Sequence, residues 1–243
     1  MRTLRLVTGH EAPAARLHLL GGFELRVHGA TVEIKPAPQR LLAMLALAGT
    51  TIQRGFAAGQ LWPDASAERA QANLRTTMWR LRHVPCELVH GTKTHIRLGA
   101  EVWVDVREGL SDSGDVLRGP RSGTALLADL LPDWYDDWLD TERERIRQLR
   151  LAALERDGEV MLEAGHPADG IQLGLRAVAL EPLRESAQRL VIRCHLAEGN
   201  LIEAVRQYER YAASLRRDLS AEPSPRMAEL LGTFRRRAPA LPS

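Results

Sequence analysis

The sequence is poor in cysteine. Its two cysteines, Cys86 and Cys194, stand far apart in the chain, and neither has a second cysteine nearby. A zinc site or a disulfide framework needs several such ligands at short spacings. We therefore expect both thiols to be reduced residues that fill the interior of the fold.

Long apolar runs are also absent. No segment approaches the roughly 20 apolar residues needed to cross a bilayer, and the N-terminus lacks the features of a secretory signal. The hydrophobic fraction of 44% and the charged fraction of 26% are typical of a soluble globular protein. We expect a cytoplasmic protein without membrane contacts.

Motifs of catalysis and cofactor binding are missing as well. The sequence contains no G-x-x-x-x-G-K-[ST], H-E-x-x-H or G-x-S-x-G, and no His/Cys group with the spacing of metal ligands. The motif of ATP-binding loops needs a lysine that follows a glycine, and neither Lys35 nor Lys93 does. We therefore expect no enzyme activity, no metal ion, no cofactor and no control by ATP.

Lysine is rare, and the charge is unevenly distributed. Lys35 and Lys93 are the only lysines among 33 basic residues, a bias that is common in GC-rich genomes and says little by itself. Residues 1–105 hold 13 basic and 8 acidic side chains, whereas residues 106–243 hold 20 basic and 23 acidic ones. The first part therefore has a net charge of +5, which suits a polyanion.

The first part of the chain predicts strands, then three helices, then a hairpin. Glycines break short apolar runs into strands, and prolines and glycines bound the helices. Ser66 can cap the third helix. The expected strands are Leu17–Leu20, Phe23–Val27 and Thr31–Ile34, followed by helices Gln39–Ala48, Arg54–Trp62 and Ala67–His83, a hairpin of Glu87–His90 and His95–Leu98, and a strand Val102–Val106.

The third helix has two faces of different character. At about 100° per residue, Leu74 shares a face with other residues suited to a core, namely Ala70, Thr77, Met78 and Leu81. The opposite face carries no acid and presents Arg69, Ala72, Arg75, Thr76, Trp79, Arg80 and His83. A surface helix with solvated arginines is the simpler interpretation of the segment alone. Its place as third helix in the basic part favours a DNA-reading helix.

This order of elements is that of a winged helix-turn-helix, in which the third helix enters the major groove and the hairpin contacts the backbone. Arginine and threonine can read base edges there. We predict base or groove contacts from Arg75, Thr76, Trp79, Arg80 and His83, and phosphate contacts from Gln39, Arg40, Arg69, Thr92, Lys93 and Arg97. Packing of Trp79 against the hairpin is an equally good interpretation.

The second part is predicted to be a linker followed by helices. Residues 107–130 are rich in glycine, serine and aspartate, which indicates a linker or a loosely ordered crossover. From Trp134 onward the pattern is helical. The acidic residues from Asp136 to Glu144 lie near Arg143, Arg145 and Arg147 and have no histidine nearby, so ion pairs on a solvated face are favoured over a metal or acid–base site.

An internal repeat lies within these helices. Ala164–Ile171 aligns with Glu198–Val205 at an offset of 34 residues, which is the period of tetratricopeptide helix pairs. Both segments are expected to be turns between paired helices. Such units bury their apolar faces only by stacking, and their grooves suit protein partners.

Four segments together resemble the SARP family, regulators of antibiotic pathways in actinomycetes. They are L-H-L-L-G-G-F-E-L-R-V-H-G (Leu17–Gly29), A-N-L-R-T-T-M-W-R-L-R (Ala72–Arg82), L-L-P-D-W-Y-D-D-W-L-D-T-E-R-E-R (Leu130–Arg145) and L-S-A-E-P-S-P-R-M (Leu219–Met227). The resemblance covers about residues 15–235. It implies a mostly α protein: an OmpR-type winged helix-turn-helix (α+β) over residues 15–107, then an all-α, tetratricopeptide-like bacterial transcriptional activation domain over residues 126–236.

The resemblance also implies an activity. Such a protein, associated with the nucleoid, would bind direct repeats in double-stranded promoter DNA near the −35 region as a side-by-side dimer. It would recruit RNA polymerase holoenzyme, through its sigma factor and alpha subunit, to an antibiotic biosynthetic gene cluster. The loop Trp62, Pro63, Asp64, Ala65 and Ser66 lies where such folds often meet the polymerase.

Two other functions remain open from the sequence. In the first, the repeat domain is the working part of an interaction adaptor, and the winged helix docks protein rather than DNA. A hydrolase or transferase is a distant third interpretation, and it would need a deep polar pocket with strongly perturbed carboxylates.

Overall fold

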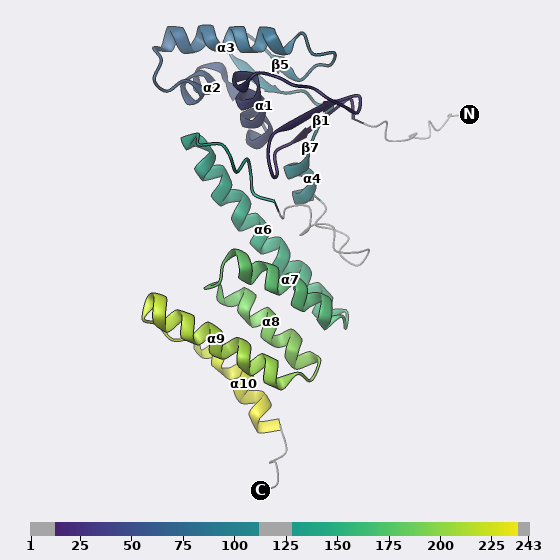
Figure 1. Ribbon diagram of the computed structural model, residues 1–243, viewed down its shortest axis with the longest axis vertical. Helices are drawn as coiled ribbons and strands as arrows, with labels where there is room; N and C mark the ends of the chain where they lie inside the picture. Colours follow the sequence, from purple (N-terminus) through teal and green to yellow (C-terminus); the bar gives the residue numbers. More distant parts are fainter. Residues whose placement is uncertain (1–12, 112–127, 238–243) are drawn as a thin grey trace, which may run out of the picture. The chain divides into compact units, whose positions relative to one another are not determined.

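The computed structural model describes residues 13–111 and 128–237. The chain forms two compact units (Figure 1). The first consists of the residues up to Glu108 together with Ala128–Glu142, and the second contains Arg143 and the helices that follow it. None of the described helices is long and apolar enough to span a membrane.

A four-stranded sheet opens the first unit, in the order β3-β2-β1-β7. Its strands are β1 (Ala15–His18), β2 (Glu24–Val27), β3 (Ala30–Thr31) and β7 (Val102–Val104). The predicted antiparallel arrangement of the first three strands is confirmed, although β3 is shorter than expected, and β7 pairs parallel to β1. The β2–β3 turn has positive φ angles at His28 (49°) and Gly29 (85°), as two-residue hairpin turns require.

Three helices follow, as predicted. They are α1 (Pro36–Ala48), α2 (Arg54–Leu61) and α3 (Ala67–Leu81). Every residue from Leu41 to Leu47 is buried, and Gly49, with φ of 67°, ends α1 in the left-handed conformation that glycine adopts freely. Between α1 and α2 lies a strand that the sequence did not predict, β4 (Ile52–Gln53).

The wing is a second sheet, in the order β4-β6-β5. The predicted hairpin is present as β5 (Val89–Gly91) and β6 (His95–Leu98), and β4 pairs with β6 on its other side. Gly99 follows β6 where the chain passes close to Glu87. A Cβ atom at Gly99 would lie only 2.1 Å from the Glu87 carbonyl oxygen, so this close approach requires glycine.

The prediction of a linker that starts at residue 107 is wrong for its first residues. A helix, α4 (Asp105–Ser111), occupies that position, and residues 112–127 of the expected linker lie outside the described residues. The Asp105 carboxylate accepts hydrogen bonds from the backbone N–H groups of Leu19 (2.9 Å) and Leu20 (3.0 Å). Arg107 donates to the Ala46 carbonyl (2.9 Å). These long-range hydrogen bonds hold α4 in place, and no local sequence pattern predicts them.

The segment Ala128–Leu139, which we name the clasp, packs on the winged-helix unit. Its Leu131 N–H donates to the Leu19 carbonyl (2.9 Å), and Trp134 stacks on Phe23 with ring centroids 5.9 Å apart. The helix predicted from Trp134 begins only at Asp137. The reason is that Trp134 and the residues after it are used to attach the chain to the first unit.

The second unit is helical, as predicted, and Figure 1 shows its helices stacked in sequence. They are α6 (Asp137–Glu163), α7 (Pro167–Leu180), α8 (Glu185–Ala197), α9 (Leu201–Leu219) and α10 (Pro225–Arg237). Gly165 and Gly199 occupy the two predicted turns with φ of 81° and 78°. Each turn also has a 2.8 Å backbone bond, from His166 N–H to Met161 O and from Asn200 N–H to His195 O. The 34-residue repeat is thus confirmed in the backbone.

Small residues let the helices of this unit approach closely. A Cβ atom at Gly170 of α7 would lie 2.8 Å from Cys194 Sγ, and one at Gly174 would lie 2.7 Å from Val191 Cγ2. Both cysteines are free; Cys194 is buried, as predicted, whereas Cys86 is only half-buried. Burial is the main cause that raises the pKa of Cys194 to about 11, and the nearby Glu159 carboxylate is the second. This thiol is therefore unreactive at neutral pH.

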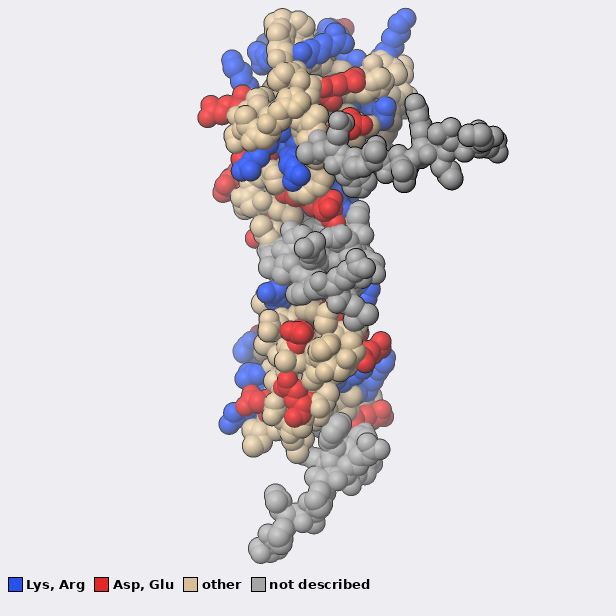
Figure 2. Space-filling model, turned by 90° about the vertical axis from the view of Figure 1, so that its right-hand side faces the viewer, with Lys and Arg blue, Asp and Glu red and all other residues tan. Residues whose placement is uncertain are grey.

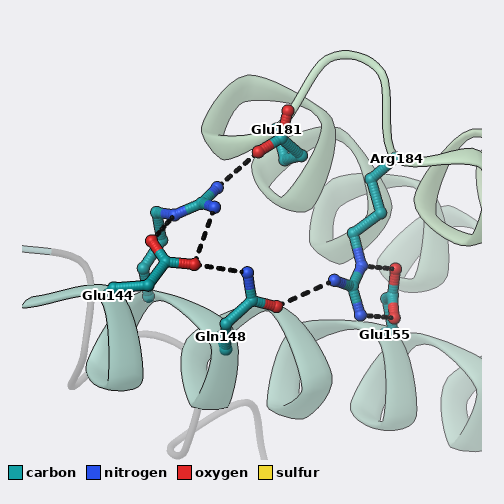
Figure 3. A network of polar contacts seen from close by, with 6 residues as sticks. Glu144, Gln148, Glu155, Glu181 and Arg184 are labelled. Carbon is teal, nitrogen blue, oxygen red and sulfur yellow. Dashed lines mark hydrogen bonds and ion pairs between the residues drawn. The ribbon is translucent and has the colours of Figure 1, made fainter. Parts of the chain in front are cut away.

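Ion pairs tie α6 to the segment between α7 and α8 (Figure 3). Arg147 pairs with Glu144 (2.9 Å) and with Glu181, while Arg184 pairs with Glu155 (2.7 Å). Gln148 bridges the two groups because it contacts both Glu144 (2.8 Å) and Arg184 (3.2 Å). In the described part of the chain, no group of three or more His, Cys, Asp or Glu side chains could hold a metal ion.

Candidate nucleic-acid interface

Helix α3 buries one face and exposes the other. Its buried residues are Ala70, Leu74, Thr77, Met78 and Leu81, which is the stripe predicted from the sequence. Ser66 caps the helix, and its Oγ accepts a hydrogen bond from the Arg69 N–H (3.4 Å). The buried stripe therefore fixes which side chains of α3 point outward.

The outward face carries the side chains predicted to read bases. Arg75, Thr76, Trp79 and Arg80 are all exposed, and they recur at helical spacing so that they share one surface. The Thr76 hydroxyl donates to the Ala72 carbonyl (3.1 Å), which leaves its lone pairs as acceptors. The two arginines give this surface a cationic and donor-rich character.

Trp79 lies on the surface and not under the hairpin. Its side chain is 60% exposed, and its ring meets His83 edge-on with centroids 4.4 Å apart. The His83 Nδ1 also contacts the Trp79 carbonyl oxygen (3.0 Å). The indole of Trp79 is therefore largely exposed to solvent, and His83, one turn away, lies against it.

The wing tip presents Lys93 on a turn that Thr92 organises. The Thr92 hydroxyl accepts hydrogen bonds from the backbone N–H groups of His95 (3.1 Å) and Thr94 (3.3 Å). Lys93 and Arg97 are exposed. Of the wing residues predicted to contact phosphate, the two cations are thus exposed, whereas the hydroxyl of Thr92 shapes the turn.

Arg54 at the start of α2 was missed by sequence reasoning. Its guanidinium donates to the Thr92 carbonyl (3.1 Å), and its backbone N–H donates to the Thr94 carbonyl (2.9 Å). Arg54 therefore braces the wing tip against α2. No local sequence pattern indicates this contact, because it depends on the pairing of the unpredicted β4 with β6.

The predicted phosphate contacts at the start of α1 have other partners. Arg40 forms an ion pair with Asp136 of the clasp, and the Gln39 amide donates to the Ile34 carbonyl (2.9 Å). These two side chains serve the fold of the unit, so we leave them out of the phosphate-contacting set. Arg69 is exposed at the first turn of α3, distant in sequence from the wing cations and close to the loop Trp62–Ser66 that precedes the helix.

The loop Trp62–Ser66 forms one wall of a cleft of about 580 Å³. Pro63 and Asp64 are exposed, and the Ala65 N–H donates to the Trp62 carbonyl (3.1 Å) to form a tight turn. The clasp contributes the opposite wall through Tyr135, which is 92% exposed, and Trp138. This wall belongs to the same unit as the loop, so the cleft is a property of the winged-helix unit.

Charge is arranged differently in the two units. On the face that Figure 2 shows, Lys and Arg side chains reach outward at the end of the winged-helix unit where Figure 1 places α3. In the helical unit, acidic and basic side chains are interspersed on the same face. The α3 end of the first unit is the part suited to a polyanion.

Comparisons with known proteins place the chain among bacterial regulators. Residues 115–234 match the bacterial transcriptional activator domain. The chain is 27% identical over 249 residues to Regulatory protein AfsR of Streptomyces coelicolor, and the alignment covers 95% of this chain and 25% of AfsR. The chain thus spans about a quarter of the length of that relative.

A solved structure supports the fold. EmbR of Mycobacterium tuberculosis, in complex with a low-affinity phosphopeptide, superposes with a TM-score of 0.72 at 20% identity, over 93% of this chain and 66% of that chain. The predicted fold class, a winged helix followed by a helical domain, is confirmed. Together with the four sequence segments, the match to the bacterial transcriptional activator domain and the likeness to AfsR support a SARP-family transcriptional activator.

Proposed function

We propose that the protein binds double-stranded promoter DNA in a sequence-specific way, through α3 and the wing. The observation that carries this proposal is the outward face of α3, where Arg75, Trp79 and Arg80 project from a helix whose other face is fully buried. A helix held in this way can enter the major groove without losing its packing. The net charge of +5 over residues 1–105 supplies the attraction to phosphate.

The side chains divide into two roles. Arg75 and Arg80 have the geometry to donate two parallel hydrogen bonds to guanine, and Thr76, whose hydroxyl donates to Ala72, can accept a hydrogen bond at a base edge. Trp79, which meets His83 edge-on, can pack against sugar or a thymine methyl group. Lys93, Arg97 and Arg69 would contact phosphates, which sets the position on DNA but carries no sequence information.

We further propose that the protein activates an antibiotic biosynthetic gene cluster by recruiting RNA polymerase from direct repeats, bound as a side-by-side dimer. The loop Trp62–Ser66 supports a polymerase contact because Pro63 and Asp64 are exposed beside a cleft with aromatic walls. In the described part of the chain, the buried Nε1 of Trp138 at this cleft has no hydrogen-bond partner. A partner that supplies an acceptor there would satisfy this donor.

A second function, a protein-interaction adaptor, is favoured by a different observation. On α9, Ile202 is 67% exposed and Leu219 is 61% exposed, and stacked helix pairs commonly bind protein through such surfaces. In this case the winged helix would dock protein and would have no affinity for DNA.

A DNA titration separates the two functions. The wild-type protein is titrated into a labelled promoter fragment of its neighbouring gene cluster and into a random fragment of equal length, at moderate salt. We expect the promoter fragment to bind at least tenfold more tightly, since specific binding exceeds non-specific binding by a large factor. Equal affinity for the two fragments would overturn sequence-specific binding, and no affinity for either would favour the adaptor.

A further inference from the structure

A groove of about 430 Å³ lies where α2, α3 and the wing meet. It is lined by Gln53, Arg54 and Gly55 from β4 and α2, by Gln71 from α3, and by the wing residues Lys93–His95. None of these lining residues carries a carboxylate. The groove therefore offers cations and neutral donors from three separate elements and nothing that repels an anion.

The walls of this groove are held in fixed positions. The pairing of Ile52 with Ile96 and of Gln53 with His95 joins β4 to the wing, and both hydrogen bonds of Arg54 end on carbonyl groups of the wing tip. The first turn of α2 also lies beside α3, since a Cβ atom at Gly55 would be in ordinary van der Waals contact, 3.7 Å, with the Gln71 amide nitrogen. The donors are thus arranged before any ligand arrives, which lowers the entropic cost of binding.

We propose that this groove binds one phosphodiester of a DNA strand that passes between α3 and the wing, a site that rests on the DNA-binding function proposed above. Arg54 has five N–H donors, and its bond to Thr92 leaves others for a phosphate oxygen. Gln71 lies one helical turn before Arg75, so the groove continues the surface of α3 that faces DNA. Arg54 is then both a positioning residue for the wing and a ligand of the phosphate.

Gln71 provides the first test, because its position on α3 lies outside the contacts that brace the wing. The Gln71→Glu variant places a carboxylate in the groove, and Gln172→Glu, at an exposed position on α7, is the matched control. We expect Gln71→Glu to weaken promoter and random DNA by the same factor, roughly tenfold at low salt, and the control to change affinity less than twofold. Unchanged affinity of Gln71→Glu would overturn the groove as a phosphate site.

Substitutions at Arg54 distinguish its two proposed roles, which are to brace the wing and to bind phosphate. If it contacts phosphate, Arg54→Lys retains the salt dependence of binding, whereas Arg54→Ala lowers the slope of log K against log salt by about 0.9. If Arg54 only braces the wing, lysine and alanine at this position have the same effect, and that result would remove Arg54 from the site.

The two lysines of the chain allow a direct footprint. Lys35, the residue before α1, is exposed like Lys93, so amine acetylation followed by mass spectrometry reports on each of them separately. We expect promoter DNA to protect Lys93 at least fivefold and to leave Lys35 unprotected. If wild-type protein binds DNA but Lys93 stays reactive, the groove proposal and the phosphate contact of Lys93 both fail, whereas DNA binding through α3 stands. If wild-type protein binds no DNA, the proposed function itself fails.

Discussion

The two units use arginine in opposite ways. In the helical unit, Arg147 and Arg184 point toward neighbouring carboxylates and join α6 to the segment before α8. In the winged-helix unit, Arg75 and Arg80 project outward from α3, and neither forms an ion pair among the residues that the structure describes. The same side chain thus stabilises the fold in one unit and remains available for a ligand in the other.

This difference shows why composition was a poor guide to function. The sequence is rich in arginine throughout, so the number of arginines in a segment does not distinguish binding from structure. What distinguishes them is whether a carboxylate lies within reach in the folded chain. Arg40 illustrates the point inside the first unit. Its partner Asp136 lies 96 residues away in the sequence, and the ion pair neutralises the charge of Arg40.

The largest expected effect concerns the packing that orients α3. Leu74 is 0% exposed, and Leu74→Ala should destabilise the winged-helix unit by about 2–5 kcal/mol because it leaves a cavity. Leu219→Ala, at a residue that is 61% exposed, is the control and should change the free energy of unfolding by less than about 0.5 kcal/mol. Urea unfolding followed by circular dichroism measures both. Similar losses in the two variants would contradict the assigned core.

Removing Arg184 tests the structural use of arginine. Arg184→Ala deletes the pair with Glu155, whose two side chains are 28% and 16% exposed, and should lower the free energy of unfolding by about 1.5–3 kcal/mol, as for hydrogen bonds to charged groups. Arg80→Ala should leave unfolding unchanged within about 0.5 kcal/mol. Chemical denaturation of both variants checks this, and a comparable loss in Arg80→Ala would break the contrast between the units.

Arg80 tests the other side of the contrast. Arg80→Ala should weaken promoter binding by about 1–3 kcal/mol and relax the preference for one base pair. Arg176→Ala, on α7 of the helical unit, is the control and should bind as the wild type does. Fluorescence anisotropy on a set of single-base promoter variants measures both effects. A uniform loss on every sequence would place Arg80 on phosphate and not on a base.

The smallest expected effect is a pH dependence in the helical unit. Glu185 accepts hydrogen bonds from the Ser224 N–H (3.0 Å) and from the Ser224 hydroxyl at the start of α10. Burial opposes ionisation, but the bonds from Ser224 and the charge of Arg189 outweigh it, so the pKa of Glu185 lies below its usual value of 4.5.

The sign of this dependence follows from the lowered pKa. A carboxylate whose pKa is lower in the folded protein than in the unfolded chain stabilises the fold at a pH above the unfolded-state pKa. This stability is lost as the pH falls through the folded-state pKa. Wild-type protein should therefore lose more stability between pH 7 and pH 4 than Glu185→Gln does. Urea midpoints at the two pH values measure the difference. Parallel losses in the two proteins would show that the Ser224 contact is not coupled to the charge.

Local patterns predicted the parts of the molecule that local forces determine. The buried stripe of α3 followed from helical periodicity around Leu74, and the two glycine turns followed from a repeated segment. The strand β4 was missed because two residues carry no periodic signal, and α4 was missed because Asp105 and Arg107 fix it through bonds to residues far away in sequence. The role of Arg54 in the site was hidden for the same reason.

The repeated turns of the helical unit have a consequence for how such a protein can change its length. The joints at Gly165 and Gly199 use the same left-handed glycine and the same pattern of backbone bonds, 34 residues apart. A segment of that length, cut at equivalent points, is therefore a complete module that begins and ends on compatible joints. We expect a chain with one copy inserted or deleted at these points to keep the glycine turn at each remaining joint.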